Sequence, residues 1–250
     1  MKLVAGLAIN SIGISDRTTL AGHADKPNQN DLEAIINSID PKVSKWASVC
    51  VVKGTENEPS FQWFHYKNSS SLVNFWPAST IKLYTVVAAL ELLNEIKMPF
   101  NSVIIFERKQ NDKWHLDTSR TMPEMISEIF RRSSNEDYTL LLRMVGIDRI
   151  NTNLLTKNRG FPRSALMRGY VRHRPYLYVP NEPQRITVQN LAGQRKIINH
   201  VWSGKSYSKE RGASIISQTN GNCTSTWELA ECLRRIMFHE HLPRSERYYL

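Results

Sequence analysis

Ser79 and Lys82 stand three positions apart, and together they could perform nucleophilic catalysis. Residues at this spacing share one face of a helix, so the lysine amine can approach the serine hydroxyl. A serine hydroxyl becomes an effective nucleophile when a nearby base takes its proton, and a desolvated lysine can be the neutral amine that acts as this base. The alternative interpretation of the pair is a helix-capping serine followed by a surface lysine.

A second Ser-x-x-Lys, at Ser206 and Lys209, shows that the spacing alone carries little information. About one match is expected by chance in a chain of this length and composition. The context separates the two copies, because Ser206 precedes a polar stretch without amphipathic spacing, which favours a loop. Ser79 opens the longest apolar helix expected in the chain, which we predict to be buried on most faces.

A third feature is Ser133-Ser134-Asn135, the one Ser-x-Asn triplet in the sequence. It lies between two expected helices, 54 residues after Ser79. A polar turn at such a junction is typical of a helix cap, so the triplet indicates chemistry only in combination with Ser79 and Lys82.

The elements that position these residues follow from apolar periodicity and turn residues. The first two strands read as a hairpin, and the order of elements indicates a mixed fold rather than regular alternation of strands and helices. Helices are expected over residues 31–39, 80–96, 122–132, 138–145, 147–155 and 226–238, and strands over residues 46–52, 61–66, 176–179, 185–189 and 196–202.

Taken together, the motifs resemble those of the class A β-lactamases and penicillin-binding proteins. Residues 75–82 are similar to the start of that family's nucleophile helix, residues 122–143 to its second motif with both flanking helices, and residues 223–230 to its threonine-rich helix start. The similarity covers residues 30–155 and 222–240. It implies an α/β (α+β) fold in which a β-lactamase/transpeptidase-like sheet is flanked by a helical subdomain.

The resemblance assigns a role to each matching residue. Ser79 would be the acylated nucleophile, with its backbone N–H as half of an oxyanion hole, and Lys82 its general base or proton relay. Ser133 would pass the proton to the leaving nitrogen. Asn135 would bind a substrate amide, and Ser134 stands at a neighbouring substrate-binding position where the class A pattern has aspartate. No metal and no other cofactor is implied.

The chain also departs from the family pattern. It has no Lys-Thr-Gly, Lys-Ser-Gly or His-Thr-Gly triplet, so we expect the fold to be incomplete at the C-terminus. The only glutamates between Ile147 and Cys223 are Glu182 and Glu210, and neither has an asparagine four residues later, as the deacylating glutamate of class A enzymes does. Residues 157–222 are longer than the corresponding family segment, and we interpret them as an enlarged Ω-loop region.

The charge of the chain is concentrated in this enlarged region. The 250 residues carry a formal net charge of +10, and residues 157–213 hold twelve Lys or Arg against two acids, which accounts for the whole excess. Arginine and aromatic residues interleave over 168–176, as in single-stranded nucleic-acid binders, but no RNA-binding signature accompanies them. We therefore expect no nucleic-acid partner and assign the patch to attraction of carboxylate-bearing substrates. No apolar run reaches the roughly 18–20 residues that span a bilayer, which argues against an integral membrane segment.

We interpret residues 1–24 as a signal sequence or a disordered N-terminus, and residues 25–250 as one β-lactamase-like hydrolase domain. The charged start and weakly apolar stretch 3–14 favour export to a periplasmic or secreted location, whereas Asp16 and Arg17 weaken that interpretation.

The sequence predicts an active-site-serine hydrolase, acylated at Ser79 by a β-lactam or a peptidoglycan-like amide, and hence a link to antibiotic resistance. Two alternatives stay open. The first is a slowly deacylating penicillin-binding-type D,D-peptidase or esterase. The second is a catalytically impaired, truncated homologue that acts as a binding or remnant protein.

Overall fold

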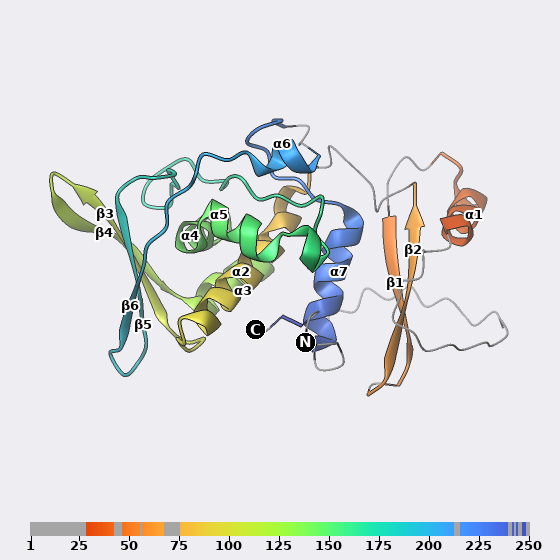
Figure 1. Ribbon diagram of the computed structural model, residues 1–250, viewed down its shortest axis with the longest axis horizontal. Helices are drawn as coiled ribbons and strands as arrows, with labels where there is room; N and C mark the ends of the chain where they lie inside the picture. Colours follow the sequence, from red (N-terminus) through yellow and green to blue (C-terminus); the bar gives the residue numbers. More distant parts are fainter. Residues whose placement is uncertain are drawn as a thin grey trace.

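The helix α2 (Lys82–Glu95) runs through the centre of the molecule (Figure 1). The computed structural model describes residues 29–42, 47–55, 57–67, 76–212, 216–239, 242, 244, 247 and 248, so the predicted signal sequence at residues 1–24 lies outside the described residues. Most of α2 is buried, because apolar side chains occupy nearly every face of it, as the sequence predicts. It packs against α4 (Asn135–Val145) and a π-helical turn, η3 (Ile150–Leu154).

The strands divide between two antiparallel sheets at opposite ends of the molecule (Figure 1). The predicted hairpin is confirmed as β1 (Ala47–Gly54) and β2 (Pro59–Tyr66). In Figure 1 this hairpin stands between α1 (Gln29–Ile39), which contacts β2, and α7 (Thr226–Met237), which contacts β1. The structure is therefore mixed α+β, with helices between the two sheets.

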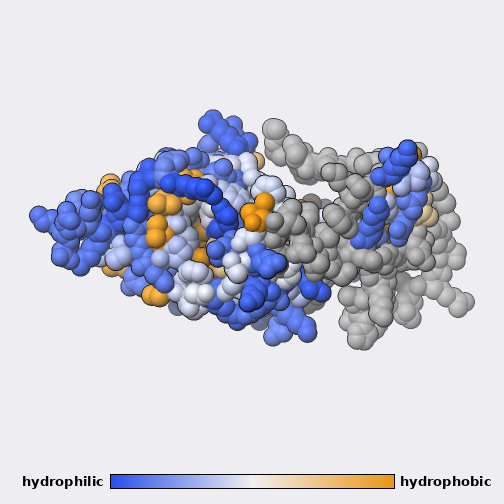
Figure 2. Space-filling view, turned by 90° about the horizontal axis from the view of Figure 1, so that it is seen from above, coloured by the Kyte–Doolittle hydropathy of each residue, from blue (hydrophilic) through white to orange (hydrophobic). Residues whose placement is uncertain are grey.

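The second sheet has the strand order β4-β3-β5-β6. Register pairs Ile104 with Val188 and Phe106 with Ile186, and these four side chains are buried against the central helices. Figure 2 shows that the end of the molecule formed by this sheet is mainly hydrophilic. The strands are β3 (Val103–Gln110), β4 (Lys113–Thr121), β5 (Gln184–Gln189) and β6 (Arg195–Ile198).

Several predicted elements are changed by tertiary packing. The strand predicted over 176–179 is wrong, because Tyr176 and Tyr178 pack against the core from an irregular segment. The helix predicted over 147–155 is a short α5 (Ile147–Arg149) that continues into the π-helical turn. Strands β3 and β4 were not predicted, and residues 207–211 form α6 (Tyr207–Arg211) instead of a loop. The helix α3 (Met122–Arg132) matches its prediction. None of the helices within the described ranges is long and apolar enough to cross a membrane.

A buried ion pair ties α4 to the second sheet. Arg143 on α4 donates from Nη2 to Oδ2 of Asp117 on β4 at 2.9 Å, and both side chains are at most 2% exposed. The other Asp117 oxygen accepts from Arg108 on β3 at 2.7 Å, and Arg143 Nη1 donates to the Pro175 carbonyl at 2.6 Å. This pair therefore fixes the helix that carries Asn135.

Asp117→Asn should lower the free energy of unfolding by about 3 kcal/mol, because it leaves Arg143 buried beside a neutral partner. Urea denaturation would measure the loss. Asp112→Asn is the control, since its pair with Lys109 is exposed, and this change should leave stability unaltered. Equal effects of the two substitutions would contradict the assignment of Asp117 as a structural anchor.

A buried polar network ties the N-terminus of α7 to residues 163–164. Glu228 Oε1 accepts from the Arg163 N–H at 2.9 Å, and its Oε2 accepts from the Ser164 hydroxyl. Ser164 and Tyr84 both bond the Thr224 hydroxyl, at 2.6 and 2.9 Å. Burial raises the pKa of Glu228 to about 7.

Because the folded protein keeps the Glu228 proton where the unfolded chain has lost it, the contribution of Glu228 to the free energy of unfolding should fall as pH rises from about 4.5 to about 7. The loss should be on the order of 2 kcal/mol, and Glu228→Gln should remove it. Urea titrations at pH 5 and pH 8 would measure the difference. Glu58→Gln, at an exposed turn, should keep the wild-type pH dependence; an unchanged dependence in Glu228→Gln would contradict the prediction.

Candidate active site

Ser79 lies on a short 3-10 turn, η2 (Ala78–Ile81), that leads directly into α2. The expected helix start at residue 80 is therefore replaced by a tighter turn, with Ala78 at a φ of 48°, in the left-handed region. Ser79 is exposed, and within the described ranges neither its hydroxyl nor its backbone N–H has a hydrogen-bond partner. Its hydroxyl is therefore accessible from solvent and forms no helix-cap hydrogen bond among the described residues.

The Lys82 amine is buried and hydrogen-bonded by the second motif. Lys82 is 2% exposed, and its Nζ donates to the Ser133 hydroxyl at 3.0 Å, to the Asn135 Oδ1 at 2.7 Å and to the Ser133 carbonyl. These three acceptors match the three N–H donors of an ammonium group. The structure thus brings Lys82, Ser133 and Asn135 together, whereas Ser79 makes no hydrogen bond to this cluster.

Opposing effects act on the charge of Lys82. Burial lowers the pKa of the Lys82 amine, and the negative charge of Glu136 partly raises it again. The rings of Tyr138 and Tyr170 lie with centroids 5.8 and 6.0 Å from Nζ, a distance at which an aromatic face attracts a cation. The pKa of the Lys82 amine is therefore lowered mainly by burial, and Glu136 opposes this effect.

The local backbone places Ser133 and Asn135 opposite α2. Ser133 ends α3 with a φ of 55°, and this left-handed residue turns the chain into α4, of which Asn135 is the first residue. Ser134 is the N-cap: its hydroxyl accepts from the Asp137 N–H at 3.1 Å and donates to the Asp137 carboxylate at 2.5 Å. The Ser134 side chain, which the resemblance gives to substrate binding, is thus occupied in a helix cap.

Two residues that were not among the predicted site residues, Tyr170 and Asn222, complete the cluster. The Tyr170 hydroxyl donates to the Ala78 carbonyl at 2.8 Å and accepts from Asn222 Nδ2 at 3.2 Å. Asn222 is 1% exposed, and its Oδ1 accepts from the N–H groups of Met167 and Arg168 at 2.7 and 3.1 Å. The sequence signal for Asn222 was its position directly before the threonine-rich helix start. Tyr170 belongs to the run of interleaved arginine and aromatic residues over 168–176, which did not indicate a role in the site.

The basic segment is partly neutralised by the fold. Arg174 pairs with Glu182, and Arg159 pairs with Glu91 at 2.5 Å. The proposed electrostatic patch at 168–174 therefore depends mainly on Arg168 and Arg172.

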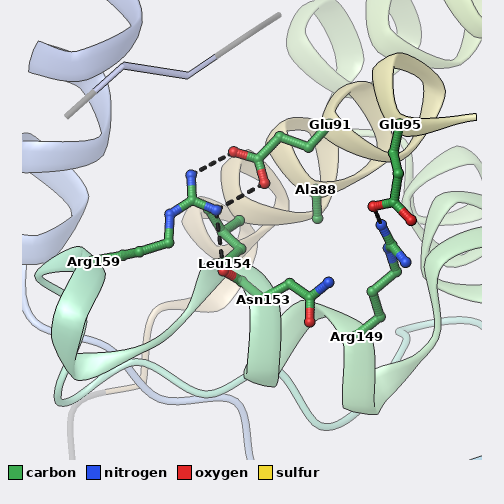
Figure 3. A pocket seen from close by; sticks show the side chains of 7 residues that line it. All are labelled: Ala88, Glu91, Glu95, Arg149, Asn153, Leu154 and Arg159. Atoms are coloured by element: carbon green, nitrogen blue, oxygen red, sulfur yellow. Dashed lines mark hydrogen bonds and ion pairs between the residues drawn. The ribbon is translucent and has the colours of Figure 1, made fainter. Parts of the chain in front are cut away.

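A separate cavity of about 210 Å³ lies between α2 and residues 149–159 (Figure 3). Its charges compensate one another, since Glu91 pairs with Arg159 and Glu95 pairs with Arg149. Ser79, Lys82 and Asn135 are not among its lining residues, so it is distinct from the candidate active site. The lining residues are Ala88, Glu91, Glu95, Arg149, Asn153, Leu154 and Arg159.

In the part of the chain that the structure describes, no group of three His, Cys, Asp or Glu side chains is arranged to hold a metal ion. Comparison with protein-family models, curated proteins and solved structures finds no match to this chain. The chemistry of the site is therefore argued from its geometry.

Asn135→Asp should raise the pKa of Lys82 by about one unit or more, because it replaces a neutral acceptor 2.7 Å from Nζ with a carboxylate. An NMR titration of isotope-labelled lysine would measure the change. Asn190→Asp is the control: Asn190 lies on the turn after β5, and this change should leave the pKa of Lys82 unaltered. An unchanged pKa in Asn135→Asp would contradict the contact between these two side chains.

Proposed function

We propose that this chain is a serine acyl-transfer enzyme of the β-lactamase and penicillin-binding type, with Ser79 as the nucleophile. The proposed substrates are β-lactams or peptidoglycan-type amides, and the proposed location is periplasmic or secreted, where such substrates occur. The observation that carries the proposal is the buried Lys82 amine, which binds Ser133 and Asn135 while the exposed Ser79 lies one turn away on the same segment.

The proposed acylation conserves every proton. The Ser79 Oγ attacks the amide carbonyl carbon, and its proton passes to a Lys82 amine that has already lost one proton. The C–N bond then breaks, and a proton travels from Lys82 through the Ser133 hydroxyl to the leaving nitrogen. The 3.0 Å hydrogen bond between Lys82 Nζ and Ser133 Oγ supports this path. Water would later add to the acyl ester, releasing the acid and restoring the serine hydroxyl.

The Ser79 N–H, which has no hydrogen-bond partner among the described residues, supports an oxyanion-stabilising role, since a backbone donor aimed at the developing negative charge lowers the barrier to acyl transfer. Asn135, whose Oδ1 is bound to Lys82, would offer its Nδ2 group to a substrate carbonyl.

A second candidate function is favoured by the charge state of Lys82. Three hydrogen-bond acceptors and two aromatic rings around the amine stabilise the ammonium form, which cannot accept the serine proton. A strongly retained proton would give slow acylation, as in a slowly turning over penicillin-binding-type peptidase or a binding protein. The two candidates differ in rate and share the same site.

Benzylpenicillin should form a covalent adduct on Ser79, which intact-mass measurement and peptide mapping would detect. Ser79→Ala should abolish the adduct, and Lys82→Met should slow its formation by about 100-fold or more. Ser206→Ala is the matched control, because Ser206 belongs to the second Ser-x-x-Lys, and this variant should be acylated at the wild-type rate.

Absence of any adduct on the wild-type protein, or an adduct that survives in Ser79→Ala, would refute the proposal. The lifetime of the adduct separates the two candidate functions. Loss within minutes indicates hydrolytic turnover, whereas persistence for hours indicates a penicillin-binding-type protein.

A further inference from the structure

We propose that Tyr170 is a positioning residue that fixes the direction of the Ala78–Ser79 peptide and thereby aims the Ser79 N–H at the oxyanion. The inference rests on the proposed acylation of Ser79. It assigns to the enlarged basic segment a role in preparing the nucleophile turn, in addition to any attraction of substrate.

One peptide unit, between Ala78 and Ser79, connects the Tyr170 hydroxyl to the Ser79 N–H. The Ala78 carbonyl and the Ser79 N–H belong to the same planar trans unit, so they point in opposite directions. Tyr170 donates from its hydroxyl to that carbonyl at 2.8 Å. Holding the carbonyl toward Tyr170 therefore holds the Ser79 N–H away from it, and this N–H has no partner among the described residues.

Ala78 has a strained backbone conformation. Its φ of 48° is unfavourable for a residue with a Cβ atom, and such residues persist where the surrounding structure holds them. The Tyr170 hydroxyl supplies such a restraint on the strained residue itself. Without this bond, only the 3-10 turn η2, among the described residues, restrains the Ala78 carbonyl, and we expect the strained peptide to rotate toward an ordinary conformation, which would turn the Ser79 N–H.

Tyr170 is itself restrained by contacts with α4 and with Asn222. Asn222 Nδ2 donates to its hydroxyl, its own N–H donates to Thr139 Oγ1 at 3.3 Å, and its ring lies 5.0 Å from that of Tyr138. The preceding residue, Gly169, permits this close approach, because a Cβ atom there would lie 2.7 Å from the Thr139 methyl carbon.

The hydroxyl geometry favours positioning over proton transfer. The Tyr170 hydroxyl donates its single proton to a carbonyl that cannot take it and accepts a hydrogen bond from Asn222. Burial raises the pKa of Tyr170, which keeps the hydroxyl protonated and able to donate. Tyr170 therefore restrains the peptide and does not act as the missing base for deacylation.

Tyr170→Phe tests the proposal by removing the hydroxyl while keeping the ring. A crystal structure of the variant should show the Ala78–Ser79 peptide rotated and Ala78 at negative φ. The first-order acylation constant with benzylpenicillin should fall by about 10- to 100-fold, with little change in the dissociation constant of the non-covalent complex. Tyr176→Phe, in the same segment, is the matched control and should change neither quantity.

A second variant, Ala78→Gly, should reduce the effect of losing the Tyr170 hydroxyl on the acylation constant. Glycine adopts positive φ without penalty, so in an Ala78→Gly background the acylation constant should fall less on Tyr170→Phe than it does in the wild-type background. An equal fall in both backgrounds would overturn the proposal, as would a Tyr170→Phe structure in which Ala78 keeps its conformation. If wild-type protein is not acylated at all, the proposed function fails, while the crystal structure still decides whether Tyr170 restrains the peptide.

Discussion

The structure around the candidate site depends on one constraint, which is the burial of the Lys82 amine. A buried cation is tolerated when every one of its donors is satisfied, because desolvation otherwise costs several kcal/mol. Lys82 meets this condition through the junction between α3 and α4, where one left-handed residue, Ser133, presents both its carbonyl and its hydroxyl. The hydrogen bonds of the Lys82 amine therefore depend on the position of α4 relative to α2.

Other buried polar contacts keep this arrangement in place. The Arg143–Asp117 pair holds α4 against the second sheet and thereby fixes the position of the helix that carries Asn135 and Tyr138. Asn222 and Glu228, at the start of α7, hold the segment from Arg163 to Tyr170 through backbone N–H groups and side-chain hydroxyls. The site thus lies where several helices and one irregular segment meet, and hydrogen bonds between these elements restrain it.

The charge of Lys82 links this architecture to reactivity. Burial favours the neutral amine that a base requires, whereas the oxygen acceptors, the aromatic rings of Tyr138 and Tyr170, and Glu136 favour the ammonium. A substrate that displaces one acceptor or excludes water would shift this balance. Under the proposed function, this balance between the neutral amine and the ammonium would separate a fast hydrolase from a slow acyl acceptor.

Local spacing along the chain was enough to predict the buried character of α2, the β1–β2 hairpin and α3. These follow from apolar periodicity and turn residues, which act over a few positions. The tertiary structure was needed to show that Tyr170 reaches Ala78, 92 residues away. It also decided that Arg174 is neutralised by Glu182. Such contacts depend on how distant segments pack, and no local pattern in the chain encodes the distance between them.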